Sequence, residues 1–211
     1  MILITGCSRA GSVFTHRVLQ QLGLRIGHEG MSRGDIGTCS HYATGLMIKY
    51  PEVYKEYFFT TILHQVRHPL KNIESLTTMK YWDHSNRGMN MPAGPSIEYV
   101  SPLDVDPSLK HDNLILQCAR YYFLYNSVAE ANSQYTFQAE KLLSDDSVFD
   151  EVCKRTGVTK LPKEIDVPKN ANSRKHVSSR KSVSWEILES LDSQLTYNLK
   201  QMADRWGYGD E

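Results

Sequence analysis

The sequence predicts an α/β fold with a mainly parallel central sheet and helices on both faces of that sheet. Short apolar or β-branched runs alternate along the chain with segments of helical periodicity, which is the pattern of strand–helix–strand units. The chain has 211 residues, of which 40% are hydrophobic, so it can bury a core of one domain's size. We therefore expect a single domain over residues 1–211, with ligands bound beyond the carboxyl ends of the strands.

The chain begins with an Ile- and Leu-rich run over residues 1–5, which predicts a strand. From Gly11 onward apolar residues recur at helical spacing, so a loop and a helix follow that strand. Residues 24–27 are expected to form a second short strand. The helical pattern over residues 41–57 contains Pro51, which is expected to break the helix.

A second strand–loop–helix unit comes next. Residues 58–66 are rich in aromatic and β-branched side chains, which favour a strand, and Pro69 is typical of the first residue of a helix. Residues 81–110 have no apolar periodicity and contain four of the eight prolines. A long loop is therefore expected over 81–110, either a functional lid or a segment without fixed structure.

The remainder of the chain is predicted to be mostly helical. Apolar and aromatic residues recur at intervals of three and four from Leu114 to Val128, which indicates a long helix with one buried face. The later elements are expected to be a short strand over 134–138, a helix over 144–156 that Gly157 ends, a loop over 158–183 and one helix from a Ser184 cap to Gly207.

The composition argues against several kinds of partner. Lys plus Arg and Asp plus Glu each total 24, so the protein has no overall attraction for nucleic acid or acidic membranes. Neither a signal-peptide pattern nor an apolar run of about eighteen residues is present, so no membrane span is expected. The four cysteines are scattered and form no C-x-x-C pair, which favours free thiols and a cytoplasmic location.

The first loop has the glycine spacing of a phosphate-binding loop. It reads G-C-S-R-A-G-S-V-F over residues 6–14 and joins a strand to a helix, where backbone N–H groups and the helix dipole can bind an anion. Ser12 and Val13 stand where a nucleoside triphosphatase has Lys and Ser or Thr, so the usual magnesium ligand is absent and Arg9 supplies the cation. From this loop alone, an anion site and a tight turn with an incidental arginine are equally good interpretations.

The second strand–helix unit carries another candidate anion group. Its strand leads to Arg67 rather than to an Asp that would hold magnesium, and a guanidinium can bind phosphate through two parallel N–H bonds. Ser75 lies roughly 9 Å along the predicted helix, so its hydroxyl and Arg67 are expected to face one crevice. Taken singly, an arginine at a sheet edge and a serine on a helix surface are the simpler interpretations.

Together, the two loops resemble the sulfotransferase family that uses 3'-phosphoadenosine 5'-phosphosulfate (PAPS). The family's 5'-phosphosulfate loop has the pattern Pro-Lys/Arg-Ser-Gly-Thr-Thr, and this chain departs from it by Ser8 for the Pro, Ala10 for the Ser and Val13 for the second Thr. The resemblance implies a P-loop-type fold and a 5'-phosphosulfate site formed by Ser8, Arg9, Ala10, Gly11, Ser12 and Val13.

Further segments extend the resemblance over most of the chain except residues 81–110. The family's 3'-phosphate site pairs an Arg with a Ser eight positions on, and Arg67 and Ser75 have this spacing. Residues 135–142 are similar to the short strand and the Tyr-Glu-Asp-Leu-type segment found late in such chains, and residues 206–208 are similar to their closing segment. The resemblance implies PAPS as donor, adenosine 3',5'-bisphosphate (PAP) as product and no metal ion.

A basic segment precedes the last predicted helix. Residues 169–181 carry five Lys and Arg side chains and no acid, so they form a local positive patch in an otherwise neutral protein. A solvated surface loop is the simpler interpretation for most such segments. Its position matches where the family closes over the 3'-phosphate, and by this resemblance Arg180 and Lys181 are chosen as ligands.

Sulfuryl transfer to an acceptor requires a group that takes the acceptor's proton. Glu29 lies at the end of the second predicted strand, where some members of the family have a glutamate base, and His28 is its rival because an imidazole titrates nearer neutral pH. By the same resemblance Arg9 stabilises the bridging oxygen of the donor as negative charge develops on it. His16 and His41 could line the cleft, although a position at the surface is the simpler interpretation.

Two other functions are compatible with these motifs: a small-molecule kinase with a degenerate phosphate loop, and a non-catalytic nucleotide-binding module of the same fold. For a sulfotransferase, residues 81–110 are expected to shape the acceptor site as a loop or lid, and their mildly acidic balance suits a neutral small molecule, sugar or lipid. The sequence selects neither a particular acceptor nor an oligomeric state.

Overall fold

Five parallel strands form the central sheet. The computed structural model describes residues 1–51, 59–79, 82, 101–158, 165–166 and 180–209. The strands are β1 (Ile2–Thr5), β2 (Ile26–His28), β3 (Gly37–Cys39), β4 (Thr61–Val66) and β5 (Tyr135–Gln138). They are ordered β2-β3-β1-β4-β5, and every neighbouring pair is parallel, which confirms the predicted α/β class.

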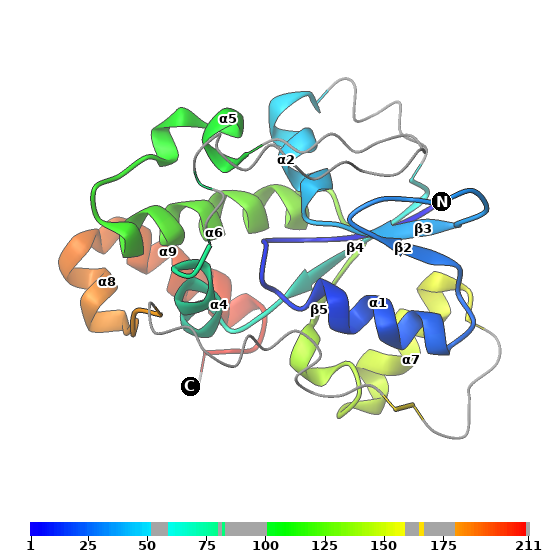
Figure 1. Cartoon of the computed structure of the whole chain (residues 1–211). Helices are drawn as coiled ribbons and strands as arrows, with labels where there is room; N and C mark the ends of the chain where they lie inside the picture. The colour runs from blue at the N-terminus through cyan, green and yellow to red at the C-terminus, as the bar shows by residue number, and fades with distance from the viewer. Residues whose placement is uncertain (52–58, 80–81, 83–100, 159–164, 167–179, 210–211) are drawn as a thin grey trace.

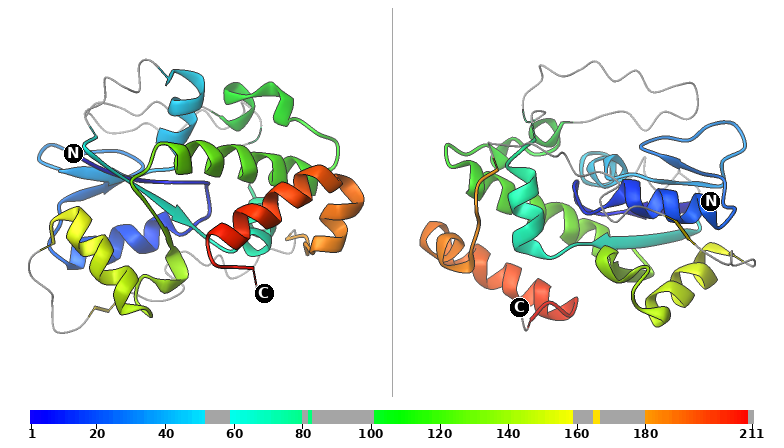
Figure 2. Two further views of the ribbon diagram at one scale, coloured as in Figure 1. Left: turned by 180° about the vertical axis from the view of Figure 1, so that it is seen from behind. Right: turned by 60° about the horizontal axis from the view of Figure 1, so that its bottom comes forward.

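Helices cover both faces of this sheet. Figure 1 shows α1 and α7 on one side and α2 and α6 on the other, and Figure 2 gives the same arrangement from behind. The α-helices are α1 (Ser12–Gln21), α2 (Tyr42–Lys49), α4 (Pro69–Leu76), α5 (Pro102–Val105), α6 (Leu114–Ala131), α7 (Asp146–Thr156), α8 (Trp185–Leu191) and α9 (Ser193–Arg205). Two 3₁₀ turns, η2 (Pro107–Leu109) and η3 (Ala139–Lys141), complete the described elements.

The alternation of side chains along β1 divides the core between the two faces. Ile2 and Ile4 pack with apolar residues of α1 and α7, whereas Leu3 packs on the opposite face with α2. A third cluster joins α4, α6, α8 and α9, and its largest members include Tyr121 and Trp206. All four cysteines are buried and free, in agreement with the expectation of unpaired thiols.

The strand that the sequence did not predict is β3. Its three residues, Gly37, Thr38 and Cys39, are all buried between β1 and β2. Gly37 is required there, because a Cβ at this position would collide with the backbone of Ile2. A strand of three residues that includes a glycine has neither the length nor the apolar alternation by which strands are recognised.

The prediction of a single last helix is wrong, because Asp192 divides it. Asp192 is extended, with φ −163° and ψ 96°, and its carboxylate accepts a hydrogen bond from the N–H of Leu195. It therefore ends α8 and caps α9. The apolar spacing continues across the break because both helices pack into the same core cluster, which includes Leu188, Leu195 and Leu199.

A further segment differs from the expectations. Residues 102–109 form α5 and η2 rather than a loop, because Ser101 and Asp106 each cap a turn that begins with proline. The predicted loop's residues 83–100 lie outside the described part of the chain. In the range 41–57, α2 ends at Lys49, which agrees with the expected break at Pro51, and residues 52–57 lie outside the described part.

We predict that Leu63→Ala lowers the free energy of unfolding by about 3 kcal/mol, because it leaves a cavity under β4. Leu63 is fully buried in the core between the sheet and α1. The control is Leu143→Ala, at a leucine that is 40% exposed; it should change the same quantity by less than about 0.5 kcal/mol. Urea denaturation measures both, and equal effects would contradict this packing.

Candidate functional site

The candidate site lies at the carboxyl ends of β1 and β4, which are neighbours in the sheet. The register pairs Thr5 with His64, so the loop after β1 and the loop after β4 begin side by side. The chain leaves β1 toward β2 on one edge of the sheet and leaves β4 toward β5 on the other. Connections that diverge in this way open a crevice, which is the usual ligand position in parallel α/β sheets.

Side chains from outside the β1–α1 loop (residues 6–11) bind the loop's carbonyl groups. Gln65 donates from Nε2 to the carbonyl oxygen of Ala10 at 2.7 Å. In the amide orientation that gives both side-chain atoms of Asn72 suitable partners, its nitrogen donates to the carbonyl oxygens of Arg9 at 3.1 Å and Ser8 at 3.2 Å. In a trans peptide the C=O and the following N–H point in opposite directions. The N–H groups of Arg9, Ala10 and Gly11 therefore point away from Gln65 and Asn72.

Three backbone positions of this loop have positive φ angles. Gly6 has φ 155° and Gly11 has φ 104°, and Arg9 has φ 68° although it is not a glycine. A non-glycine residue in the left-handed region costs energy and occurs most often where function requires it. The N–H of Cys7 is already used, because it donates to Asn126 Oδ1 at 3.1 Å. The N–H groups that can face a ligand therefore belong to the residues after Cys7.

The helices that start at the carboxyl edge of the sheet lack side-chain caps. The N-caps of α1, α2 and α4 make no side-chain hydrogen bond to the first turn. By contrast, α5, α6, α7, α8 and α9 are each capped by a Ser, Asn or Asp side chain. An uncapped first turn leaves N–H groups and the positive end of the helix dipole for an anion.

The structure brings Arg9, Arg67 and Ser75 together. Arg9 donates from Nε to Ser75 Oγ at 3.0 Å, and Arg67 donates from Nη1 to the carbonyl oxygen of Arg9 at 3.5 Å. The backbone of Arg67 is held by Tyr122, whose hydroxyl donates to the Arg67 carbonyl at 3.0 Å. Glu140 Oε1 lies 3.9 Å from Arg67 Nε and accepts the N–H of His68. The two predicted anion loops are therefore in direct contact.

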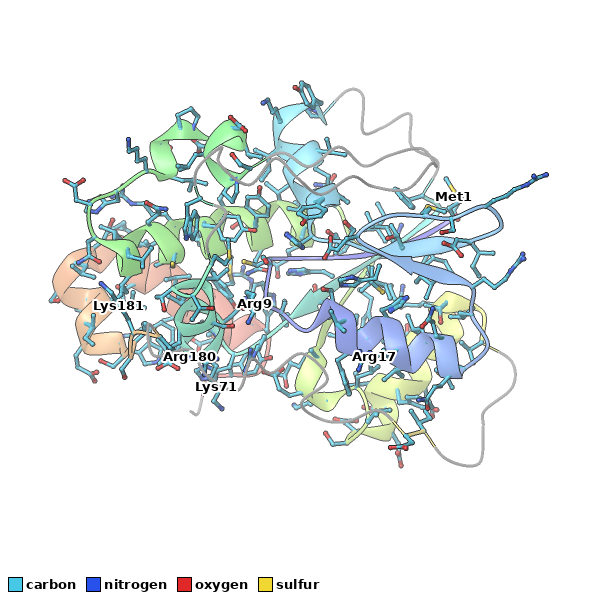
Figure 3. The ribbon with its side chains drawn as sticks, viewed as in Figure 1. Met1, Arg9, Arg17, Lys71, Arg180 and Lys181 are labelled. Atoms are coloured by element: carbon cyan, nitrogen blue, oxygen red, sulfur yellow. The ribbon has the colours of Figure 1, made fainter. Side chains whose placement is uncertain are left out.

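The described end of the basic segment lies along α4. The N–H of Lys181 donates to Thr77 Oγ1 at 3.1 Å, and the N–H of Val183 donates to Glu74 Oε1 at 3.1 Å. Figure 3 shows Arg9, Lys71 and Arg180 close to α4 in this view, with Lys181 nearer α8. Residues 169–179 of the basic segment lie outside the described part of the chain.

Ser12, His28 and Glu29 form a second group next to the β1–α1 loop. Ser12 Oγ lies 3.0 Å from His28 Nε2, and Glu29 Oε1 lies 3.5 Å from the same nitrogen. Burial lowers the pKa of His28; Glu29 opposes this shift and His41 adds to it. The imidazole of His28 is thus mostly neutral at pH 7.

Glu29 is held by two side chains, Ser40 and His41, whose contacts with it the sequence did not predict. Ser40 donates to Oε2 at 2.9 Å, and His41 Nδ1 donates to Oε1 at 2.8 Å. Of the two positions that the sequence left open for His41, the structure supports the cleft rather than the surface, because its side chain is only 12% exposed and lines the small hollow described below. Burial by itself raises the pKa of Glu29, but His41, His28 and Ser40 stabilise the carboxylate, and its pKa falls below its ordinary value. This is the opposite of the raised pKa that a carboxylate base would need.

A small hollow lies between the β1–α1 loop and the Glu29 group. Its lining residues are Ile4, Thr5, Gly6, Cys7, Ala10, Ser12, His41 and Gln65. The Oε1 atom of Gln65 is buried there, and among the described residues it has no hydrogen-bond partner. Since a buried carbonyl oxygen normally accepts a hydrogen bond, the hollow suits a bound group that carries a donor.

A buried polar chain supports the loop from the side of β4. Asn126 Oδ1, which accepts from Cys7, also lies 3.0 Å from His64 Nε2, while His64 Nδ1 lies 3.2 Å from Thr136 Oγ1. Because Asn126 Oδ1 can only accept, His64 carries its proton on Nε2 and accepts from Thr136. Burial lowers the pKa of His64 to about 4, so this imidazole is neutral at pH 7.

Comparison with protein-family models and with curated proteins finds no match. In the part of the chain that the structure describes, no three His, Cys, Asp or Glu side chains are grouped to hold a metal ion. Likewise, no described helix is long and apolar enough to cross a membrane.

We predict that acid destabilises the protein through His64. Between pH 6.5 and about 4 the unfolded chain binds a proton on this imidazole that the folded chain does not bind. The free energy of unfolding should therefore fall as the pH falls through this window, by about 3 kcal/mol from His64 alone. Denaturation of His64→Gln at several pH values should show a shallower pH dependence than the wild type, whereas His111→Gln, at an exposed histidine, should keep the wild-type slope. Parallel curves for all three proteins would contradict the assignment.

Proposed function

We propose that the protein is a PAPS-dependent sulfotransferase of the P-loop type, which transfers a sulfuryl group to a hydroxyl or amine acceptor. The observation that carries this proposal is the contact between the two anion loops, in which Arg9 reaches Ser75 and Arg67 reaches the backbone of Arg9. PAPS carries phosphate groups on the 3' and 5' positions of one ribose. Two arginine-bearing loops in contact with each other could bind these two groups at once. The eight-residue spacing of Arg67 and Ser75, which resembles the 3'-phosphate motif of the sulfotransferase family, also supports the proposal.

In this proposal the 5' end of the donor is bound by the β1–α1 loop. Loop N–H groups, the uncapped start of α1, Arg9 and the Ser12 hydroxyl supply positive potential and hydrogen-bond donors. In the same proposal Arg67 and Ser75 bind the 3'-phosphate, and Arg180 and Lys181 join them from the segment before α8, which contacts the end of α4 through the Lys181 N–H and Thr77 Oγ1. These fixed positive groups stabilise the charge that develops on the leaving phosphate.

The reaction exchanges one S–O bond for another. The acceptor oxygen or nitrogen forms a bond to sulfur while the bond from sulfur to the bridging oxygen breaks. The electron pair of the broken bond stays on the 5'-phosphate of PAP, and the acceptor's proton passes to His28 or Glu29. Binding both reactants in one crevice supplies the favourable orientation.

Two alternative activities fit the site less well. A magnesium-dependent kinase normally has a lysine near the end of its phosphate loop and an Asp after the neighbouring strand, whereas this chain has Ser12 and Arg67. A hydrolase triad built on Ser12 would need a carboxylate on the far nitrogen of His28, but Glu29 and Ser12 both face Nε2. A non-catalytic module would bind the nucleotide at the same site as the proposed sulfotransferase, but it would not transfer a sulfuryl group.

We predict that PAP binds with chelator present and that Arg67→Ala weakens this binding roughly 10- to 100-fold, because a charge-assisted hydrogen-bond pair to phosphate is lost. Isothermal titration calorimetry with PAP, 5'-AMP and magnesium ATP measures the effect. Arg67→Ala should also remove the preference for PAP over 5'-AMP. The matched control is Arg120→Ala, whose arginine pairs with Asp192 at 3.6 Å, and its PAP affinity should equal that of the wild type.

Magnesium ATP binding more tightly than PAP, with loss of binding on chelation, would instead support a kinase. Transfer is tested separately, with radiolabelled PAPS and a panel that contains a monosaccharide, a phenol, a long-chain alcohol and an amine. Tight PAP binding with no labelled product from any of them would support the non-catalytic module.

A further inference from the structure

The sulfotransferase proposal leaves two residues, His28 and Glu29, as candidates for the group that takes the acceptor's proton. They are adjacent in sequence but differ in surroundings. His28 ends β2 and Glu29 follows it with φ 56°, a left-handed backbone that a glutamate rarely adopts. This conformation directs the Glu29 carboxylate toward the end of β3, where Ser40 and His41 lie.

We propose that His28 accepts the proton and that Glu29 is a positioning residue, held by Ser40 and His41, that stabilises the protonated imidazole. This inference rests on the proposed sulfuryl transfer. It adds Ser40 and His41 to the site, and it gives the carboxylate a role other than that of base.

The hydrogen bonds of Glu29 argue against its acting as the base. Both of its oxygen atoms already accept hydrogen bonds, Oε2 from Ser40 and Oε1 from His41. Each bond stabilises the ionised form and reduces the affinity of the carboxylate for a proton. The side chain is 15% exposed, so an acceptor has little access to it.

The position of His28 suits proton transfer. Its Nε2 lies 3.0 Å from Ser12 Oγ, in the first turn of α1, beside the loop proposed to hold the phosphosulfate. The neutral imidazole can take the acceptor's proton on Nε2 as the acceptor oxygen bonds to sulfur and the bridging S–O bond breaks. The new N–H then lies 3.5 Å from Glu29 Oε1, whose negative charge stabilises the imidazolium.

Three titratable groups surround this imidazole. Glu29 and, from the start of α2, His41 act on His28 from the side of β3, while His16 of α1 lies with its ring centroid 5.5 Å from that of His28. His16 Nε2 lies 3.1 Å from the carbonyl oxygen of Ile26, and this nitrogen therefore donates to that oxygen. His16 is consequently a matched control, because it is a neighbouring histidine outside the Ser12–His28–Glu29 group.

The test combines kinetics and NMR. With PAPS and whichever panel acceptor the wild type sulfates, His28→Gln should lower kcat at least about 100-fold. Glu29→Gln should lower kcat about 10-fold and move the acidic limb of the pH profile to lower pH, because the imidazolium loses its carboxylate. Histidine NMR with PAP bound should show the same downward shift in the His28 titration. His16→Gln should keep the wild-type kcat at the plateau of its profile, within about 3-fold.

Thermal unfolding and PAP calorimetry check that each variant is folded and binds the nucleotide. An inactive Glu29→Gln beside an active His28→Gln, or an unchanged His28 titration in Glu29→Gln, would overturn the assignment and leave the proposed function standing. A wild type that neither binds PAP nor transfers sulfate would overturn the proposed function, and this assignment with it.

Discussion

The backbone carbonyl groups of the β1–α1 loop accept hydrogen bonds from side chains outside the loop, and this constraint determines what the site can bind. Thr44 donates to Gly6, Asn72 to Ser8 and Arg9, and Gln65 to Ala10. Because the carbonyl groups of Ser8, Arg9 and Ala10 are held by Asn72 and Gln65, the N–H groups of Arg9, Ala10 and Gly11 point away from those two side chains. A loop fixed in this way does not need to reorganise before it binds an anion, so more of the binding energy is retained.

The same hydrogen bonds couple the two halves of the crevice. Gln65 and Asn72 belong to β4 and α4, the unit that also carries Arg67 and Ser75. The unit proposed to bind the 3'-phosphate therefore also supports the loop proposed to bind the 5' group. The ends of β2 and β3 position the second group of site residues. Because His28 pairs with Cys39 in the sheet, Glu29 lies next to Ser40 and His41.

Local patterns predicted much of this arrangement from the sequence. Two of these patterns depend only on nearby residues: the glycine spacing of the first loop, and the eight-residue spacing that places Ser75 on the helix after Arg67. The supports of the loop could not be predicted, because a buried Gln or Asn acquires its partner through tertiary packing. The contact of His41 with Glu29 could not be predicted for a related reason: without β3, nothing in the sequence places His41 at the same sheet edge as Glu29. The left-handed conformation of Glu29 has no sequence signal at all.

Contact of one adenosine nucleotide with both loops can be measured by ³¹P NMR of PAP, because the 3' and 5' phosphorus resonances are distinct. Both resonances should shift on binding, with chelator present, and Arg67→Ala should reduce the 3' shift while the 5' shift persists at saturating protein. A shift of one resonance alone in the wild type, or shifts that appear only with added magnesium, would contradict this contact with both loops.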